Sequence, residues 1–363
     1  MTTVADNPDL TRAVACATQA QAALAAHAPA LALVAAREAA DLFGATLGPS
    51  SADRAYALVL QSRAHSQAGD ETAALSAAQA AHDIARGLTS GATLDRVRVQ
   101  ARQRLGQVHR ARGDYARAHR LLTAALADAR ATLGPDDLDT AGLHNDLGMV
   151  GKYSGHFDEA ADHYARALAI LESAFGAGHP ELASIHHNLG GLAHARGDHA
   201  AAEPHARRAV AIRATALGDD RPAVAADRAA LAGVLQDLGQ LEEAEALLRE
   251  AARTFARALG DDHVEVAIAR TSLAAVLHRA GRLEEAEREY RGGLAARERH
   301  AGPDHPELTT TLMNVGGLVA ERGDRAEARA LYRRALCLLD GTVATDHPRR
   351  RACLRRLAEL TPC

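Results

Sequence analysis

The sequence has few of the residues that build aromatic cores or membrane spans. Tryptophan is absent, and aromatic residues make up only 3% of the 363 residues. No apolar run approaches the length that spans a bilayer, and the first residues, MTTVADNPDL, have neither the basic nor the apolar region of a signal peptide. We therefore expect a cytoplasmic protein without a membrane partner.

Cysteine is also scarce, and its spacing matches no known framework. The four cysteines lie far apart or without metal-ligand spacing, so neither a disulfide framework nor a zinc site is indicated. They are Cys16, Cys337, Cys353 and Cys363.

Catalytic motifs and an excess of charge are missing too. The chain contains no phosphate-binding G-x-x-x-x-G-K-[ST] loop and no G-x-S-x-G nucleophile elbow. Its formal net charge of -4 creates no general attraction for nucleic acid. We therefore expect no enzymatic activity, no cofactor and no nucleic-acid partner.

What the sequence does have is helix-forming residues arranged in a repeat. Alanine, leucine, arginine and glutamate dominate, which favours helices throughout. A glycine followed by a polar or charged residue recurs at intervals of 44 and then 42 residues, the longer interval reflecting an insertion near Ser90 and Gly91. A fixed period of this length predicts stacked supersecondary units. These glycines are Gly69, Gly113, Gly155, Gly197, Gly239, Gly281 and Gly323.

Small residues keep the same register around each glycine. Five residues after it comes alanine in every repeat, from Ala74 to Ala328, and seven residues further on comes alanine or, once, Gly293. Seven residues before it the side chain is small again, as at Ser62, Gly148 and Ala232. We infer that two helix backbones meet closely at these positions, with the glycine turn between them.

The repeat also reaches both ends of the chain. His27 stands where the first repeat would have its turn glycine, and His305-Pro306 recurs as His347-Pro348 before a final arginine-rich segment. We interpret Arg349, Arg350, Arg351, Arg355 and Arg356 as a solubilising cap rather than a nucleic-acid surface, because no aromatic residues are interleaved. We place the repeats at residues 9–48, 49–91, 92–134, 135–176, 177–218, 219–260, 261–302 and 303–346, with a capping helix at 347–363, all in one domain covering 1–363.

Two segments resemble tetratricopeptide repeats of the kinesin light chain type: HHNLGGLAHARGDHAAAEPHARRAVAIRATALG from His186 to Gly218, and MNVGGLVAERGDRAEARALYRRAL from Met313 to Leu336. The resemblance covers almost the whole chain. It implies an all-α fold, an α-solenoid or right-handed superhelix of about eight helical hairpins plus a capping helix. It also implies a scaffold that binds a peptide or partner domain in a concave groove.

The family resemblance and the repeat register together predict the binding residues. Asparagines of the family that hold a peptide backbone correspond to Asn145, Asn188 and Asn314, whereas Ala229-Ala230 and Thr271-Ser272 replace them elsewhere. Stacking would also align one polar position of each first helix into a stripe that suits an acidic segment or a C-terminal carboxylate, although it could simply be a solvated face. The candidates are Arg110, Asn145, Lys152, His187, Asn188, His194, Gln236, His278 and Asn314.

The alternative hypothesis is a metal-dependent enzyme or metal sensor built on the fifth repeat. The predicted helices of that repeat contain five of the 19 histidines, none of them in an H-E-x-x-H pattern. His187 and His194 lie about 10 Å apart along a helix axis, too far for one ion without a ligand from a neighbouring repeat. We therefore predict no metal ligand. The five are His186, His187, His194, His199 and His205.

Overall fold

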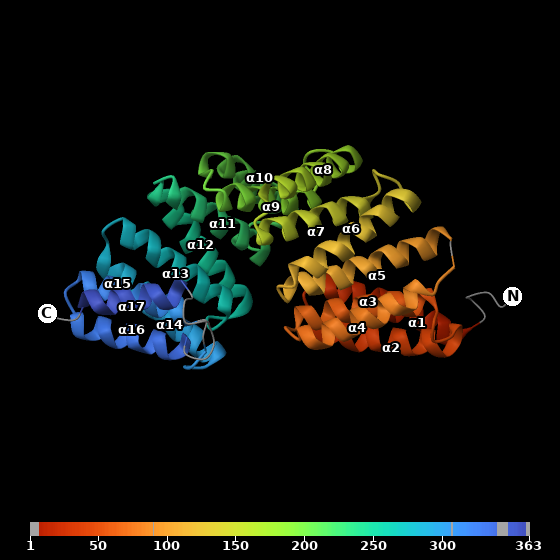
Figure 1. Cartoon of the computed structure of the whole chain (residues 1–363), viewed down its shortest axis with the longest axis horizontal. Coiled ribbons are helices and arrows are strands. Elements are labelled where there is room, and N and C mark those ends of the chain that lie inside the picture. Colours follow the sequence, from red (N-terminus) through yellow and green to blue (C-terminus); the bar gives the residue numbers. More distant parts are fainter. Residues whose placement is uncertain (1–6, 90, 306–307, 340–347, 361–363) are drawn as a thin grey trace. The chain divides into compact units, whose positions relative to one another are not determined.

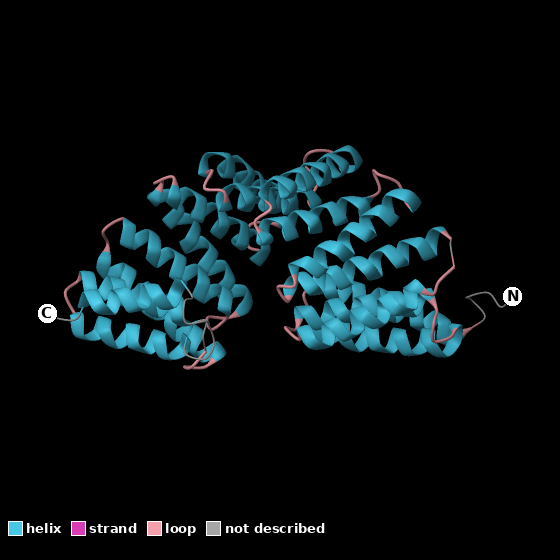
Figure 2. Cartoon of the chain, viewed as in Figure 1, coloured by secondary structure: helices cyan, strands magenta, loops and turns pink. Residues whose placement is uncertain are grey.

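The computed structural model describes residues 7–89, 91–305, 308–339 and 348–360. Every regular element in these ranges is a helix (Figure 1), and only loops and turns join them (Figure 2). The expected all-α repeat fold is confirmed. The predicted features that involve Ser90, Pro306, His347 and Cys363 lie outside the described residues.

The chain divides into two compact units, Met1–Ala177 and Gly178–Cys363, each made of consecutive helical hairpins. The single domain expected from the sequence stays a prediction, and each unit is described by itself. The N-terminal unit contains α1 (Pro8–Ala25), α2 (Pro29–Leu47), α3 (Ala52–Gln67), α4 (Glu71–Arg86), α5 (Ala92–Ala111), α6 (Tyr115–Thr132), α7 (Leu138–Ser154) and α8 (Phe157–Phe175). The C-terminal unit contains α9 (Glu181–Ala195), α10 (His199–Leu217), α11 (Pro222–Asp237), α12 (Leu241–Leu259), α13 (Val264–Arg279), α14 (Leu283–Ala301), α15 (Leu308–Glu321), α16 (Arg325–Leu339) and α17 (Pro348–Leu360).

The turn inside each hairpin uses the predicted glycine in a left-handed backbone conformation. All seven glycines from Gly69 to Gly323 have φ between 75° and 95°, a region that a side chain disfavours. The polar residue after the glycine often caps the second helix, as where Asp198 Oδ1 accepts a hydrogen bond from the Ala201 backbone N–H at 3.0 Å. In the first hairpin His27 adopts the same left-handed turn, with φ of 53°.

The small residues form the seam between the two helices of each hairpin. The seven alanines from Ala74 to Ala328 that follow the turn glycines are fully buried. A Cβ atom added to Gly148 would stand 2.6 Å from the Tyr164 ring, and one added to Gly106 would stand 2.7 Å from Leu122. Close helix packing therefore depends on the absence of side chains at these places.

Helix α17 covers the last hairpin of the C-terminal unit. Cys353 and Leu360 of α17 are buried in the same apolar cluster as Tyr332 and Leu338 of α16. The Cys353 thiol donates a hydrogen bond to the Tyr332 carbonyl at 3.1 Å, and burial raises the pKa of this thiol to about 11. Among the described residues, no helix is long and apolar enough to cross a membrane.

Candidate binding pocket

The nine candidate residues all lie on the first helix of a hairpin, as the repeat register predicts. Arg110 is on α5, and Asn145 and Lys152 are on α7, in the N-terminal unit. In the C-terminal unit, α9 carries His187, Asn188 and His194, α11 carries Gln236, α13 carries His278, and α15 carries Asn314. Their side chains are partly buried rather than fully solvated.

In the N-terminal unit, the two cationic candidates have no carboxylate partner among the described residues. The Arg110 Nε atom is buried and has no hydrogen-bond acceptor there. The Lys152 ammonium lies 5.6 Å from the centre of the Tyr153 ring, an arrangement that stabilises a cation. Desolvation lowers the pKa of Lys152. Both groups therefore keep unused capacity to bind an anion.

In the C-terminal unit, the histidines of the predicted stripe have carboxylate partners one repeat further on. The His194 Nε2 atom lies 2.8 Å from Asp237 Oδ2, and His278 Nε2 lies 2.7 Å from Glu321 Oε2. Arg279 Nη1 in turn donates to Asp237 Oδ1 at 3.2 Å. The stripe here is thus a row of hydrogen-bonded side-chain pairs between neighbouring hairpins, which explains part of its polarity without a ligand.

His187 has a similar role closer to the core. Its Nδ1 atom lies 2.8 Å from Oδ1 of the buried Asp227, whose other oxygen accepts from Arg213 Nε at 2.6 Å. These contacts hold α9, α10 and α11 together. His187 therefore contributes to the packing of neighbouring hairpins.

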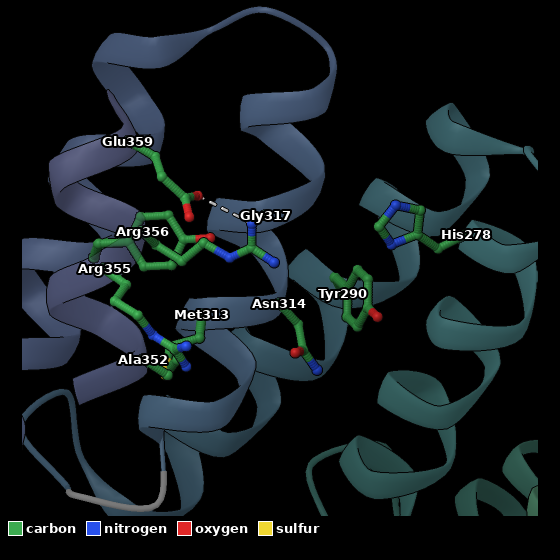
Figure 3. A pocket seen from close by; sticks show the side chains of 10 residues that line it. His278, Tyr290, Met313, Asn314, Gly317, Ala352, Arg355, Arg356 and Glu359 are labelled. Carbon is green, nitrogen blue, oxygen red and sulfur yellow. Dashed lines mark hydrogen bonds and ion pairs between the residues drawn. The ribbon is translucent and has the colours of Figure 1, made fainter. Parts of the chain in front are cut away.

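His278 and Asn314 are brought together at a pocket of about 450 Å³ in the C-terminal unit. The lining also includes Tyr290 and Tyr332, which are almost completely buried. Arg355 and Arg356 extend from α17 on one side, while His278 and Tyr290 stand on the opposite side (Figure 3). The other seven candidates do not line this pocket.

The pocket wall formed by α17 carries the free positive charge. Arg356 Nη1 lies 3.2 Å from Glu359 Oε2, so its charge is partly balanced (Figure 3). Arg355 is exposed and has no carboxylate partner among the residues that the structure describes. A guanidinium in this position can donate two parallel hydrogen bonds to an anion, because its N–H groups form a planar fork.

A second group of polar side chains gathers at the turn between α9 and α10. His194, His199 and Asp237 each place one potential metal-ligand atom within 4.8 Å of the others. Desolvation would raise the pKa of Asp237, but the hydrogen bond with His194 and the charges of His199 and Arg279 outweigh it, so the pKa lies below its usual range. Asp237 is therefore a carboxylate at neutral pH.

Sequence reasoning did not identify Arg355 or Asp237 as partners of the stripe. Arg355 belongs to the segment interpreted as a solubilising cap, and only the folding of α17 onto α16 places it beside Asn314. Asp237 stands one residue after the stripe position of its own repeat, but its contact with His194 depends on how the next hairpin packs, which the register does not give.

Comparison with solved structures supports the fold. A Rap protein complexed with Competence and Sporulation Factor is 15% identical, with a TM-score of 0.62, over 97% of this chain and 98% of that one. The signal transduction ATPase with a tetratricopeptide repeat sensor from Pyrococcus horikoshii is 16% identical, with a TM-score of 0.62, over 89% of this chain and 46% of that one. BtubC from P. vanneervenii is 20% identical, with a TM-score of 0.51, over 69% and 92%.

No curated protein sequence is significantly similar to this chain. The tetratricopeptide repeat family model, in contrast, matches residues 98–173, 154–215, 181–251, 223–299 and 271–340. These matches overlap and together cover more than half of the chain, over the hairpins whose turn glycines run from Gly113 to Gly323. The chain therefore belongs to the tetratricopeptide repeat family, whose members are generally interaction scaffolds and not enzymes.

Proposed function

We propose that this chain is a non-enzymatic scaffold that binds a peptide or partner segment at the pocket between α13, α15 and α17. The ligand class is an extended segment that carries an acidic side chain or a free C-terminal carboxylate. The observation that carries the proposal is that Arg355, a cation without a carboxylate partner among the described residues, faces the same pocket as Asn314 and His278.

The size and lining of the pocket fit one or two side chains of a peptide. Its volume of about 450 Å³ is within the range of small-ligand sites. Tyr290 and Tyr332 supply an apolar floor, and the Asn314 amide can both donate to a peptide C=O and accept from a peptide N–H. The pocket thus combines apolar contact with backbone recognition.

The family and its relatives favour a binding role. Tetratricopeptide repeat proteins are generally interaction scaffolds, and the Rap protein of similar fold was solved with Competence and Sporulation Factor. That complex supports a ligand-binding role for the fold. The proposed binding residues and the acidic character of the ligand are inferred from the pocket of this chain.

Fluorescence polarisation with labelled acidic peptides tests the proposal. Each peptide is compared with a version in which glutamine replaces glutamate and with a version amidated at its C-terminus. We expect Arg355→Glu to weaken binding at least tenfold, because the new carboxylate repels the acidic group. The matched control is Arg351→Glu, which makes the same charge change at another exposed position of α17.

Equal peptide affinity of the Arg355→Glu and Arg351→Glu proteins would contradict a role of the pocket in binding. A further variant, Arg110→Glu with Lys152→Glu, tests the unpaired cations of the N-terminal unit. Loss of binding in that variant, with full binding by Arg355→Glu, would assign recognition to the N-terminal stripe and contradict the proposal.

A further inference from the structure

A metal-type arrangement of side chains lies at the turn between α9 and α10, outside the pocket. His194 is the second-last residue of α9, His199 begins α10 after the left-handed Gly197, and Asp237 ends α11 of the next hairpin. The Asp237 Oδ2 atom lies 2.8 Å from His194 Nε2 and 4.0 Å from His199 Nδ1. The two imidazole rings are 5.2 Å apart between centroids.

One of the three possible ligand atoms also lacks a hydrogen-bond partner. The Nδ1 atom of His199 is buried and has no hydrogen-bond partner among the described residues. A buried polar atom without a partner is uncommon, because leaving it unsatisfied costs free energy. An ion placed between the three ligand atoms would satisfy it.

The surroundings orient the carboxylate toward such an ion. Arg279 Nη1 donates to Asp237 Oδ1, which leaves Oδ2 facing the two imidazoles. In metal sites, hydrogen bonds from neighbouring side chains to the ligands hold the ligands in the orientation that binds the ion. The positive charge of Arg279 opposes a cation, whereas the C-terminal ends of α9 and α11 carry partial negative charge that favours one.

The donor set defines the class of ion. Two imidazole nitrogens and one carboxylate oxygen suit Zn²⁺ and related transition ions, and they do not suit Ca²⁺ or Mg²⁺, which prefer oxygen ligands. Tetrahedral coordination at about 2.1 Å requires ligand atoms roughly 3.4 Å apart. The two separations from Asp237 Oδ2, 2.8 and 4.0 Å, bracket that value, and all three ligand atoms lie within 4.8 Å of one another.

We propose that His194 Nε2, His199 Nδ1 and Asp237 Oδ2 bind one Zn²⁺ ion that links the hairpin α9–α10 to α11. Three protein ligands leave the fourth tetrahedral position for water or for a donor group of a partner. The site does not depend on the peptide pocket, because none of the three ligands lines it. This proposal differs from the sequence-based expectation of no metal ligand. That expectation rested on the distance between His187 and His194, whereas the structure places His194 beside His199 across the turn.

Isothermal titration of zinc chloride into tag-free, EDTA-treated and dialysed full-length protein tests this site. We expect saturable binding of one ion per chain. His199→Asn and Asp237→Asn should each weaken it at least tenfold. The matched control is His187→Asn, which also removes a histidine of α9 paired with a carboxylate of α11, but has no second imidazole in a metal cluster. Helical circular dichroism and its thermal melting check that each variant folds.

A second readout uses Co²⁺, whose visible absorption reports tetrahedral coordination. The band should appear in the wild type and in His187→Asn, and it should be lost in His199→Asn. No stoichiometric zinc in the wild type, or equal zinc affinity of the His199→Asn and His187→Asn proteins, would overturn the proposal. Arg355→Glu should bind zinc normally, so a failed peptide pocket and a failed metal site give different results.

Discussion

At the scale of single residues, the seam inside a hairpin leaves no room for an added side chain. Gly148 faces the ring of Tyr164, which is fully buried and therefore cannot move aside. We expect Gly148→Ala to lower the free energy of unfolding by about 1 to 3 kcal/mol, because overpacking outweighs the better helix propensity of alanine. Urea denaturation followed by circular dichroism measures the change.

Gly233 on α11 provides the matched control for this seam. It is a helical glycine like Gly148, but a Cβ atom added there would meet nothing within 4 Å. Gly233→Ala should therefore raise stability by up to about 1 kcal/mol. If both substitutions stabilised the protein, the close approach of Tyr164 to Gly148 would not be a determinant of the fold.

At the scale of helices, pairs of histidines join the two helices of consecutive hairpins. His144 Nδ1 on α7 lies 2.8 Å from His163 Nδ1 on α8, and His186 Nδ1 on α9 lies 3.1 Å from His205 Nδ1 on α10. Burial, followed by the charge of the partner histidine, lowers the pKa of His144 and of His186 to about 4. Both pairs are therefore neutral at pH 7.

These pairs predict a loss of stability in mild acid. Because the folded-state pKa of His144 lies below its unfolded value near 6.5, the unfolded chain binds more protons as the pH falls from 6.5 towards 4. Replacing both His144 and His163 with glutamine should therefore reduce the loss of unfolding free energy between pH 7 and pH 4.5 by about 2 kcal/mol. Urea denaturation at each pH provides the measurement.

The exposed His300 supplies the control for the pH experiment. The control protein carries His300→Gln, which replaces an exposed histidine outside the two pairs. Glu159 acts in the opposite direction by raising the pKa of His163, but Arg166 lowers it, and burial exceeds both. An unchanged pH profile in the His144→Gln/His163→Gln protein would show that the pair does not titrate as proposed.

The sequence predicted contacts inside each hairpin better than contacts between hairpins. The turn glycines and the alanine seam follow directly from the 42-residue register, because the same backbone geometry recurs in every repeat. The pairing of His194 with Asp237 depends on how one hairpin packs on the next, and the entry of Arg355 into the pocket depends on the docking of α17. Periodicity fixes neither of these.

At the scale of the whole molecule, contacts connect mainly consecutive helices, so a local defect should stay local. Leu312 on α15 is fully buried within the C-terminal unit. Leu312→Ala should cost about 2 to 5 kcal/mol through the cavity it leaves. In repeat proteins each repeat contacts only its neighbours, so amide exchange should accelerate in α13 to α17 and stay unchanged in α3 to α6.

Hydrogen exchange with mass spectrometry measures both regions in one sample. Leu338 of α16 lies in the same cluster but is less deeply buried. Leu338→Ala should accelerate amide exchange in the same helices, α13 to α17. Equal acceleration across α3 to α6 would contradict the local model and would show that the chain unfolds as one cooperative body.

The glycines that end the second helix of a hairpin have one further consequence. Gly48, Gly176, Gly218, Gly260 and Gly302 share φ between 80° and 98° and ψ between 153° and 159°. Because these junctions have the same backbone geometry, inserting or deleting one whole repeat at such a glycine would rejoin ends of matching conformation. The length of the array can therefore change without redesigning any one hairpin.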